Sequence, residues 1–348
     1  MEDNFKTIAM NELKQKQGYS LEEKINYSKA KIAEFVEKMG GEDKVFVSFS
    51  GGKDSTVLLH LVRSVYPNVK AVFMNTGLEY PEIVQFVKTV DNVVWKKPRK
   101  TVTQAWSSDG IPAVSKEVSN YINDVRTSKS EKLIGKRLNY RGSFSIPRKW
   151  IFLCDKEFTP YEISHHCCKY FKKLPSEDYI KETGEFPIVG TMANESSLRL
   201  NSWIRYSCNM YDGNKIQSRP LSIWTDDDIW EYIEKYNVEV CDLYYRGHNR
   251  TGCFLCPYGS HLDKSEKNKF ELLKEQHQQQ YKALDKLGIK RVLMDMNVNI
   301  SNDSEYMKEK EIRQNEIKQW YINVENDLKL NKENSKYWMF HKYFNLDK

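Results

Sequence analysis

Six residues at positions 50–55, Ser50-Gly51-Gly52-Lys53-Asp54-Ser55, stand between a short β-rich run and an apolar run of helical composition. Adjacent glycines permit positive φ angles and close backbone approach, so successive N–H groups can point at phosphate oxygens. The start of the following helix adds a partial positive charge, and Lys53 adds a full one. The segment is not the common P-loop, because G-x-x-x-x-G-K-[ST] needs four residues between its glycines. It predicts a different phosphate-binding loop; the alternative is a Gly-Gly turn that only joins strand to helix.

The flanking sequence alternates between strand-like and helix-like runs. Strands are expected at 44–49, 70–74 and 92–95, with helices at 56–62 and 81–89 between them. This order is typical of an α/β fold with a parallel twisted sheet and helices on both faces. We expect an N-terminal helical segment at 1–40, a nucleotide-binding domain at 41–260 and a helical region at 261–348. In the last region, 263–287 and 303–328 each resemble one long charged helix.

Composition bears on the class of protein. No apolar stretch approaches the roughly 18 residues of a membrane span, and the first residues lack the pattern of a signal peptide. The seven cysteines are an odd number in a long chain without a secretion signal. This favours a cytoplasmic protein without a membrane partner, in which clustered cysteines hold metal or perform chemistry.

Positive charge is concentrated in one segment. Residues 96–149 hold thirteen Lys and Arg against four Asp and Glu, a local charge of +9, whereas the whole chain carries +6. The periodicity of 96–150 is weak and the segment contains several Gly and Pro, which indicates either an insertion or a mobile segment that faces the substrate. Aromatic residues are interleaved with the charges, a combination that suits DNA or RNA. A solvated basic surface without a partner is the alternative.

Four cysteines form two close pairs. Cys167 and Cys168 are adjacent, and Cys253 and Cys256 have C-x-x-C spacing. Thiolates at this spacing can hold one metal ion or two corners of an iron–sulfur cluster. Alternatively they are buried apolar thiols, as we assume for Cys154, Cys208 and Cys241.

Four segments together resemble the phosphoadenosine phosphosulfate (PAPS) reductase family, within the PP-loop ATP pyrophosphatases of the adenine nucleotide α-hydrolase superfamily. They are residues 50–55, Asn75-Thr76-Gly77-Leu78-Glu79-Tyr80-Pro81-Glu82, the 190–199 segment from Gly190 to Arg199, and the 219–230 segment from Arg219 to Trp230. The resemblance implies that ATP or a related adenine nucleotide binds with Mg²⁺, and that Lys53, Asp54 and Arg199 are catalytic. The implied nucleotide-binding residues are Ser48, Ser50, Gly51, Gly52, Lys53, Asp54, Ser55, Asn75, Thr76, Gly77, Gly190 and Arg199.

The four paired cysteines resemble the [4Fe-4S] site of adenosine phosphosulfate (APS) reductases and of the sulfurtransferases of DNA phosphorothioation. The resemblance therefore implies a [4Fe-4S] cluster on Cys167, Cys168, Cys253 and Cys256, with Zn²⁺ as the alternative.

One departure from the family bears on the reaction. Sulfonucleotide reductases attack sulfur with a cysteine in a C-terminal Glu-Cys-Gly-Leu-His-like tail, and this sequence has no cysteine after Cys256. We therefore expect an ATP pyrophosphatase that adenylates its substrate, so that sulfur from a sulfur-donor protein can replace AMP, with a nucleic acid bound through 96–150. The alternatives are a PAPS or APS reductase that uses an external thiol, and a nucleotide- or DNA-binding module without turnover.

Overall fold

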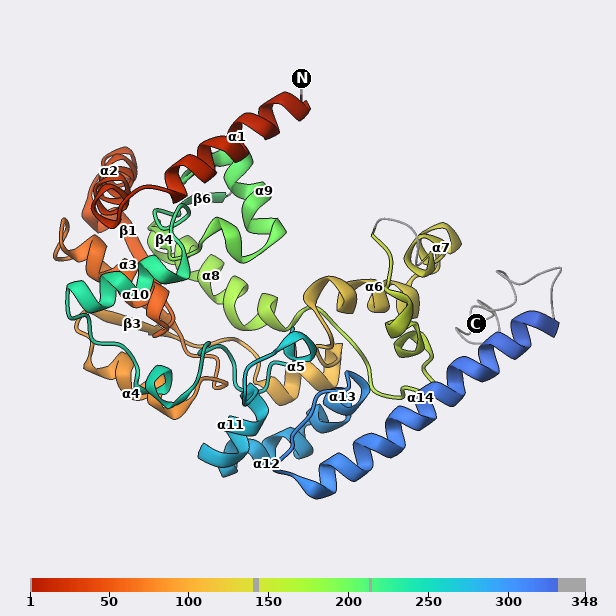
Figure 1. Ribbon diagram of the computed structural model, residues 1–348. Helices are drawn as coiled ribbons and strands as arrows, with labels where there is room; N and C mark the ends of the chain where they lie inside the picture. The colour runs from red at the N-terminus through yellow and green to blue at the C-terminus, as the bar shows by residue number, and fades with distance from the viewer. Residues whose placement is uncertain (1, 140–143, 213–214, 331–348) are drawn as a thin grey trace. The chain divides into compact units, whose positions relative to one another are not determined.

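The computed structural model describes residues 2–139, 144–212 and 215–330 (Figure 1). The chain divides into two compact units, each made from two separate stretches. Unit 1 comprises residues 1–99 and 171–252, and unit 2 comprises residues 100–170 and 253–348. No helix in the described ranges combines the length and the apolarity needed to cross a membrane.

Unit 1 is built on a six-stranded sheet with the order β3-β2-β1-β4-β6-β5. All neighbouring strands run parallel except β5 and β6, which form an antiparallel pair. The strands are β1 (Val45–Phe49), β2 (Lys70–Met74), β3 (Val93–Lys96), β4 (Phe186–Val189), β5 (Asn209–Asp212) and β6 (Lys215–Ser218).

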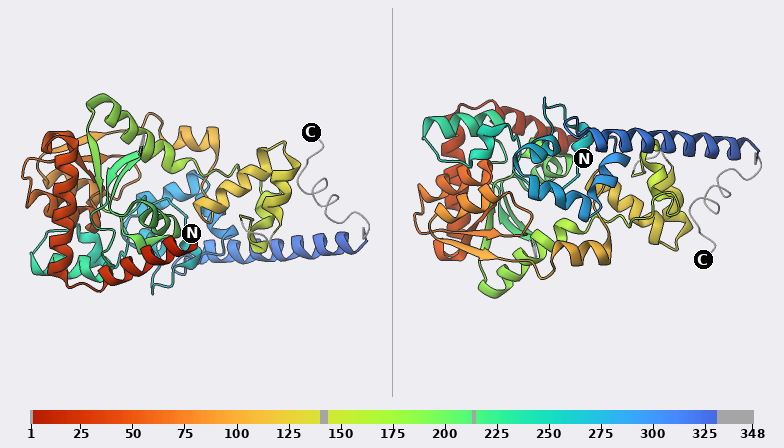
Figure 2. Two further views of the ribbon diagram at one scale, coloured as in Figure 1. Left: turned by 90° about the horizontal axis from the view of Figure 1, so that it is seen from above. Right: turned by 90° about the horizontal axis from the view of Figure 1, so that it is seen from below.

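Helices cover both faces of this sheet (Figures 1 and 2). On one face, Tyr179 packs with Phe46 and Val72. On the other, Phe49 contacts Phe86, with ring centres 6.4 Å apart. Residues that alternate along a strand point to opposite faces, so Phe46 and Phe49 support different layers. The helices of unit 1 are α1 (Glu2–Gln17), α2 (Leu21–Met39), α3 (Lys53–Arg63), α4 (Pro81–Thr89), α8 (Leu174–Thr183), α9 (Ser197–Tyr206) and α10 (Asp226–Lys235).

Unit 2 is helical. Its centre contains a buried polar network in which Asp295 accepts hydrogen bonds from Tyr161 Oη at 2.6 Å and from Arg313 Nε at 2.5 Å. A buried ion pair is tolerated when its remaining partners are supplied in this way. The helices are α5 (Val102–Asp109), α6 (Lys116–Thr127), α7 (Glu131–Leu138), α11 (Lys269–Gln276), α12 (Gln278–Lys286), α13 (Ile289–Asp295) and the long α14 (Ser304–Leu330), which Figure 2 shows as one uninterrupted helix.

The predicted fold class is confirmed: a mostly parallel sheet with helices on both faces, followed by a helical region near the C-terminus. Three local expectations differ. Residues 96–150 are not irregular, because α5, α6 and α7 each begin at a capping hydroxyl, from Thr101, Ser115 and Ser130. The helix expected at 263–287 is broken at His277, whose φ of −139° is not helical. The β5–β6 pair was not expected.

Candidate nucleotide site and cysteine cluster

The predicted phosphate-binding loop, residues 50–55 (below, the phosphate loop), lies where the strand order of the sheet reverses. After β1 the chain builds β2 and β3 on one side, and it later places β4 on the other. In open parallel sheets, ligands bind outside the carboxyl ends of the strands at such a point. Gly190 follows β4 and lies against the first turn of α3, since a Cβ added there would stand 3.1 Å from the Asp54 carbonyl oxygen. Residues 50–55 and the start of the 190–199 segment therefore meet at the carboxyl ends of β1 and β4.

The loop has little room for side chains. Gly51 has a φ of +72°, and a Cβ at this position would lie 2.9 Å from methyl groups of Ile83 and Val87. Ser55 Oγ accepts a hydrogen bond from Ser50 N at 3.1 Å and donates to the Gly52 carbonyl at 2.9 Å. Ser48 lies within β1, in register with Val72 and Val189. Both conformation and space therefore require glycine at position 51.

Lys53 stands between two carboxylates. Its ammonium donates to Asp54 Oδ1 at 2.9 Å and to Asp226 Oδ1 in a short contact. Burial would lower the pKa of Lys53, but these hydrogen bonds outweigh it and raise the pKa above its ordinary value. Lys53 therefore carries its positive charge at the start of α3.

Tyr244 contacts the same loop and was not anticipated from the sequence. Its hydroxyl accepts a hydrogen bond from Lys53 N at 2.9 Å and lies 2.9 Å from Thr251 Oγ1. The Tyr244 ring also meets Trp230 edge-on, with centres 5.7 Å apart. The sequence gives no signal for this contact, because 191 positions separate Lys53 from Tyr244.

Two arginines lie near the loop. Burial lowers the pKa of Arg199, the charge of Arg250 lowers it further, and Asp54 opposes the shift. Arg199 therefore lies within electrostatic reach of Asp54, and it pairs with Glu195. Arg250 was not predicted.

The segment after β2 forms a tight turn. Thr76 N and Thr76 Oγ1 donate to the Glu79 carboxylate at 2.9 and 2.7 Å. Gly77 N donates to Asn75 Oδ1 at 3.1 Å. Glu79 thus stabilises the turn that carries three of the predicted nucleotide-binding residues, Asn75, Thr76 and Gly77.

The four paired cysteines lie together in unit 2. Burial raises the pKa of Cys167, and the charges of Cys168, Cys253 and Cys256 raise it further. Each of the four thiols is partly exposed. Within residues 2–139, 144–212 and 215–330, no three His, Cys, Asp or Glu side chains form a ready-made group for one metal ion. What the structure provides is three further thiols, those of Cys168, Cys253 and Cys256, within electrostatic reach of Cys167.

Buried donors surround these thiols. Trp106 Nε1 is buried, and a hydrogen bond from its side chain to Cys167 lowers the pKa of that thiol against the effect of burial. Tyr258 Oη is also buried, and it interacts with Ser119. Burial raises the pKa of Tyr258, and the charges of Cys256, Cys168 and Cys167 raise it further. Trp106 therefore provides a buried donor directed at one of the four thiols.

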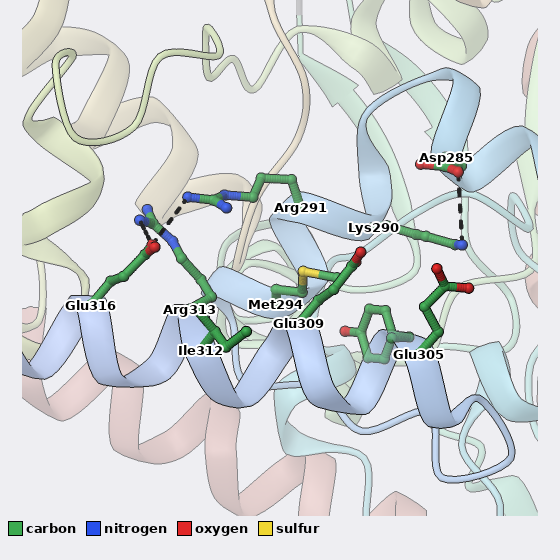
Figure 3. Close-up of a pocket in the computed structure, with 10 residues that line it drawn as sticks. Asp285, Lys290, Arg291, Met294, Glu305, Glu309, Ile312, Arg313 and Glu316 are labelled. Carbon is green, nitrogen blue, oxygen red and sulfur yellow. Dashed lines mark hydrogen bonds and ion pairs between the residues drawn. The ribbon is translucent and has the colours of Figure 1, made fainter.

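A separate hollow of about 440 Å³ lies between α12–α13 and α14 in unit 2 (Figure 3). Ion pairs line it: Glu316 bridges Arg313 at 2.8 Å and Arg291 at 3.6 Å. It contains none of the residues of the phosphate loop or the cysteine cluster. This hollow is therefore separate from the candidate active site.

Comparison with known proteins gives several similar chains. An adenosine 5′-phosphosulfate reductase of Bacillus cereus is 23% identical over 221 residues, which cover 62% of this chain and 74% of that protein. Two uncharacterized proteins of Methanocaldococcus jannaschii are 25% and 26% identical over 60% and 65% of this chain. The matched region spans only 40% and 38% of their lengths.

Among solved structures, a phosphate complex of the PAPS reductase from Candida auris aligns with a TM-score of 0.37 and 14% identity. The alignment covers 60% of this chain and 81% of that one. The phosphoadenosine phosphosulfate reductase domain matches residues 44–133 and 117–258, which include the phosphate loop and all four paired cysteines. The chain belongs to the phosphoadenosine phosphosulfate reductase domain family.

Proposed function

We propose that this protein is an ATP-using PP-loop enzyme that adenylates an acceptor so that sulfur can replace AMP. The observation that carries the proposal is the charged Lys53 at the start of α3, held by Asp54 and Asp226, with Arg199 within electrostatic reach of Asp54. Helix N-termini and lysines bind phosphates, and a second cation stabilises the charge that develops on a leaving pyrophosphate. Asp54 and Asp226 offer carboxylate oxygens, the ligands that Mg²⁺ prefers.

In the proposed reaction an acceptor oxygen attacks the α-phosphorus of ATP. A new P–O bond forms, the bond to the bridging oxygen breaks, and pyrophosphate leaves with the electron pair. A sulfur-donor protein carrying a persulfide, together with a thiol reductant, then supplies sulfur at the oxidation level of hydrosulfide. This sulfur displaces AMP from the acceptor. Lys53 and Arg199 hold the phosphates throughout, and positioning supplies much of the rate.

We further propose that Cys167, Cys168, Cys253 and Cys256 hold a [4Fe-4S] cluster. The support is that Cys168, Cys253 and Cys256 all lie within electrostatic reach of Cys167, and that the buried Trp106 donates toward the Cys167 thiol. Hydrogen bonds to cluster sulfur are a common way in which proteins tune such groups. When bound, the cluster supplies a compact negative charge with electron-transfer capacity.

The relatives named adenosine 5′-phosphosulfate reductases support a second candidate, sulfonucleotide reduction with an external thiol. One set of assays separates the candidates. AMP and pyrophosphate formed from ATP support adenylation, whereas sulfite formed from APS or PAPS with a thiol reductant supports reduction. If neither product forms and nucleotide still binds, the protein is a nucleotide-binding module without turnover.

Removing the Tyr244 hydroxyl is expected to tighten nucleotide binding. The Tyr244 hydroxyl accepts the hydrogen bond of Lys53 N–H. A phosphate bound at residues 50–55 would need the same donor, so the hydroxyl competes with it. One such hydrogen bond contributes about 0.5–1.5 kcal/mol, so Tyr244→Phe should lower the Kd for ATP by about 3- to 10-fold. Isothermal titration measures the change, and Tyr245→Phe, at a neighbouring side chain that is 70% exposed, is the control. Weaker binding in Tyr244→Phe would show instead that the hydroxyl itself contacts the nucleotide.

We propose a nucleic acid as the acceptor, bound through part of the basic segment. Arg126 donates to three main-chain carbonyls, and Arg137 pairs with Asp124 at 2.8 Å, so both stabilise unit 2. Of the interleaved rings, Trp106, Tyr121 and Trp150 are buried and unavailable for stacking. Phe144 is 61% exposed, and Lys136 lies 4.9 Å from its ring centre. Tyr140 and Arg141 lie outside the described residues.

The exposed lysines around α7 are therefore expected to carry polynucleotide binding. Binding of duplex DNA should weaken as salt rises, and each neutralised phosphate contributes about −0.9 to the log–log slope. Replacing Lys129, Lys132 and Lys136 with alanine should reduce the magnitude of the slope by about 2 to 3 without changing ATP binding. Fluorescence anisotropy at several salt concentrations measures it, with alanine at exposed Lys264, Lys282 and Lys286 as the control. Equal slopes for the two triple variants, or no retention of DNA or RNA at low salt, would remove the proposed acceptor.

A further inference from the structure

Lys269 is the first residue of α11 and lies outside residues 44–258, the part that matches the family domain. Its ammonium donates to the carbonyl oxygens of Cys253 at 3.0 Å and Cys256 at 2.6 Å. Cys256 N donates to the same Cys253 carbonyl at 3.1 Å, so Lys269 closes the C-x-x-C turn from one side.

The position of Lys269 is fixed by the cap of its helix. Asn268 Oδ1 accepts hydrogen bonds from Phe270 N at 2.9 Å and Glu271 N at 3.3 Å. Asn268 Nδ2 donates to the Asn299 carbonyl at 2.7 Å. Glu271 in turn accepts from Ser301 N at 2.8 Å. The start of α11 is thus tied to the segment before α14, and Lys269 has little freedom to leave the cysteine turn.

Lys269 is partly exposed, and its ammonium lies within electrostatic reach of Cys256, Cys253 and Asp263. A cation with restricted access to water is favoured by negative charge nearby. Two thiolates, or a metal group that they ligate, provide it.

We propose that Lys269 is a positioning residue of the cysteine cluster, which balances the negative charge of the thiolate-bound group. The inference rests on the proposed cluster, and it makes the region after the family domain a part of that site. Two functions of the lysine have to be separated: its charge, and its hydrogen bonds to the turn.

Three substitutions in the full chain separate these functions. Lys269→Arg keeps the charge and the donors, Lys269→Gln keeps donors without charge, and Lys269→Met removes both. Each protein is purified in the absence of oxygen. Its content of iron and acid-labile sulfide is then measured, and the rate at which it releases iron to a chelator is followed. Residues that support metal ligands typically contribute about 10- to 100-fold in affinity. We expect the variants Lys269→Met and Lys269→Gln to release iron at least about tenfold faster than the wild type. The variant Lys269→Arg should release iron at a rate near that of the wild type. Lys267→Met, at an exposed lysine paired with Glu275, is the matched control.

Each outcome decides the question. If Lys269→Gln releases iron at the wild-type rate while Lys269→Met releases it faster, the lysine only closes the turn and the charge-balancing role is wrong. If Met also keeps the wild-type rate, Lys269 has no role at the site. Wild-type protein without bound iron or sulfide removes the proposed cluster, and with it this inference. Circular dichroism of each variant shows whether the helices remain folded.

Discussion

Lys53→Ala is expected to abolish pyrophosphate release and to weaken ATP binding by at least about tenfold. Lys53 supplies a full positive charge at the start of α3, and hydrogen bonds from charged groups contribute about 1.5–3 kcal/mol. The substitution also leaves Asp54 and Asp226 without the cation that lies between them. Their negative charges would then repel the phosphates. Titration of ATP and a pyrophosphate assay measure the two effects separately.

A double variant distinguishes these causes. In Lys53→Ala with Asp226→Asn, one uncompensated carboxylate is removed while the lysine is still missing. Recovery of binding without recovery of turnover would assign the loss of affinity to repulsion and the loss of turnover to the missing cation. Lys44→Ala, at an exposed lysine next to β1, is the control. Unchanged ATP affinity in Lys53→Ala would show that the phosphates bind elsewhere.

Changing Cys253 and Cys256 together to serine is expected to eliminate bound iron and inorganic sulfide. Two of four thiolate ligands are lost, and serine does not replace a thiolate at an iron–sulfur cluster. Wild-type protein purified without oxygen should hold about four irons and four sulfides per chain and should be brown. Metal and sulfide analysis and visible absorption measure the difference.

Cys241→Ala is the matched control, because Cys241 is a buried thiol of unit 1 outside the cluster. It should retain the iron content of the wild type. Stoichiometric zinc without sulfide in the anaerobic wild type would replace the cluster with a Zn²⁺ site. Metal-free wild-type protein would leave the four cysteines without the role proposed for them.

The parts of the molecule that were predictable are those fixed by neighbouring residues. The role of Gly51 could be predicted because a turn between strand and helix needs its positive φ. The strand β1 and the helix α3 could be predicted from hydrophobic runs a few residues long. The cap of α10 is of the same kind, since Thr225 and Asp228 are three positions apart. Such signals stay within one turn or one strand.

The partners of the loop were not predictable, because they come from distant parts of the chain. Asp226 is 173 positions from Lys53, and Tyr244 is 191 positions away. Single residues of these types occur throughout the sequence, and only the fold selects which ones reach the loop. The prediction that aromatic side chains of the basic segment are available for stacking was wrong for a related reason. Trp106, Tyr121 and Trp150 alternate with charges in the sequence, but they are buried in α5, α6 and the turn at Arg148–Cys154.

The alternation of the two units along the chain sets the order in which the sites can be completed. The strand β1 pairs early with β2, since paired residues such as Phe46 and Lys70 are 24 positions apart, but its other neighbour β4 pairs at a separation of 141 positions and follows the whole stretch 100–170. During synthesis the first half of unit 1 must therefore wait with one side of β1 unpaired while part of unit 2 is made. Pairings between distant segments form slowly because a long loop must close first. The candidate nucleotide site lies at this late pairing, so it is among the last features of unit 1 to form, and a chain interrupted before residue 186 would carry residues 50–55 without the strand that completes the site.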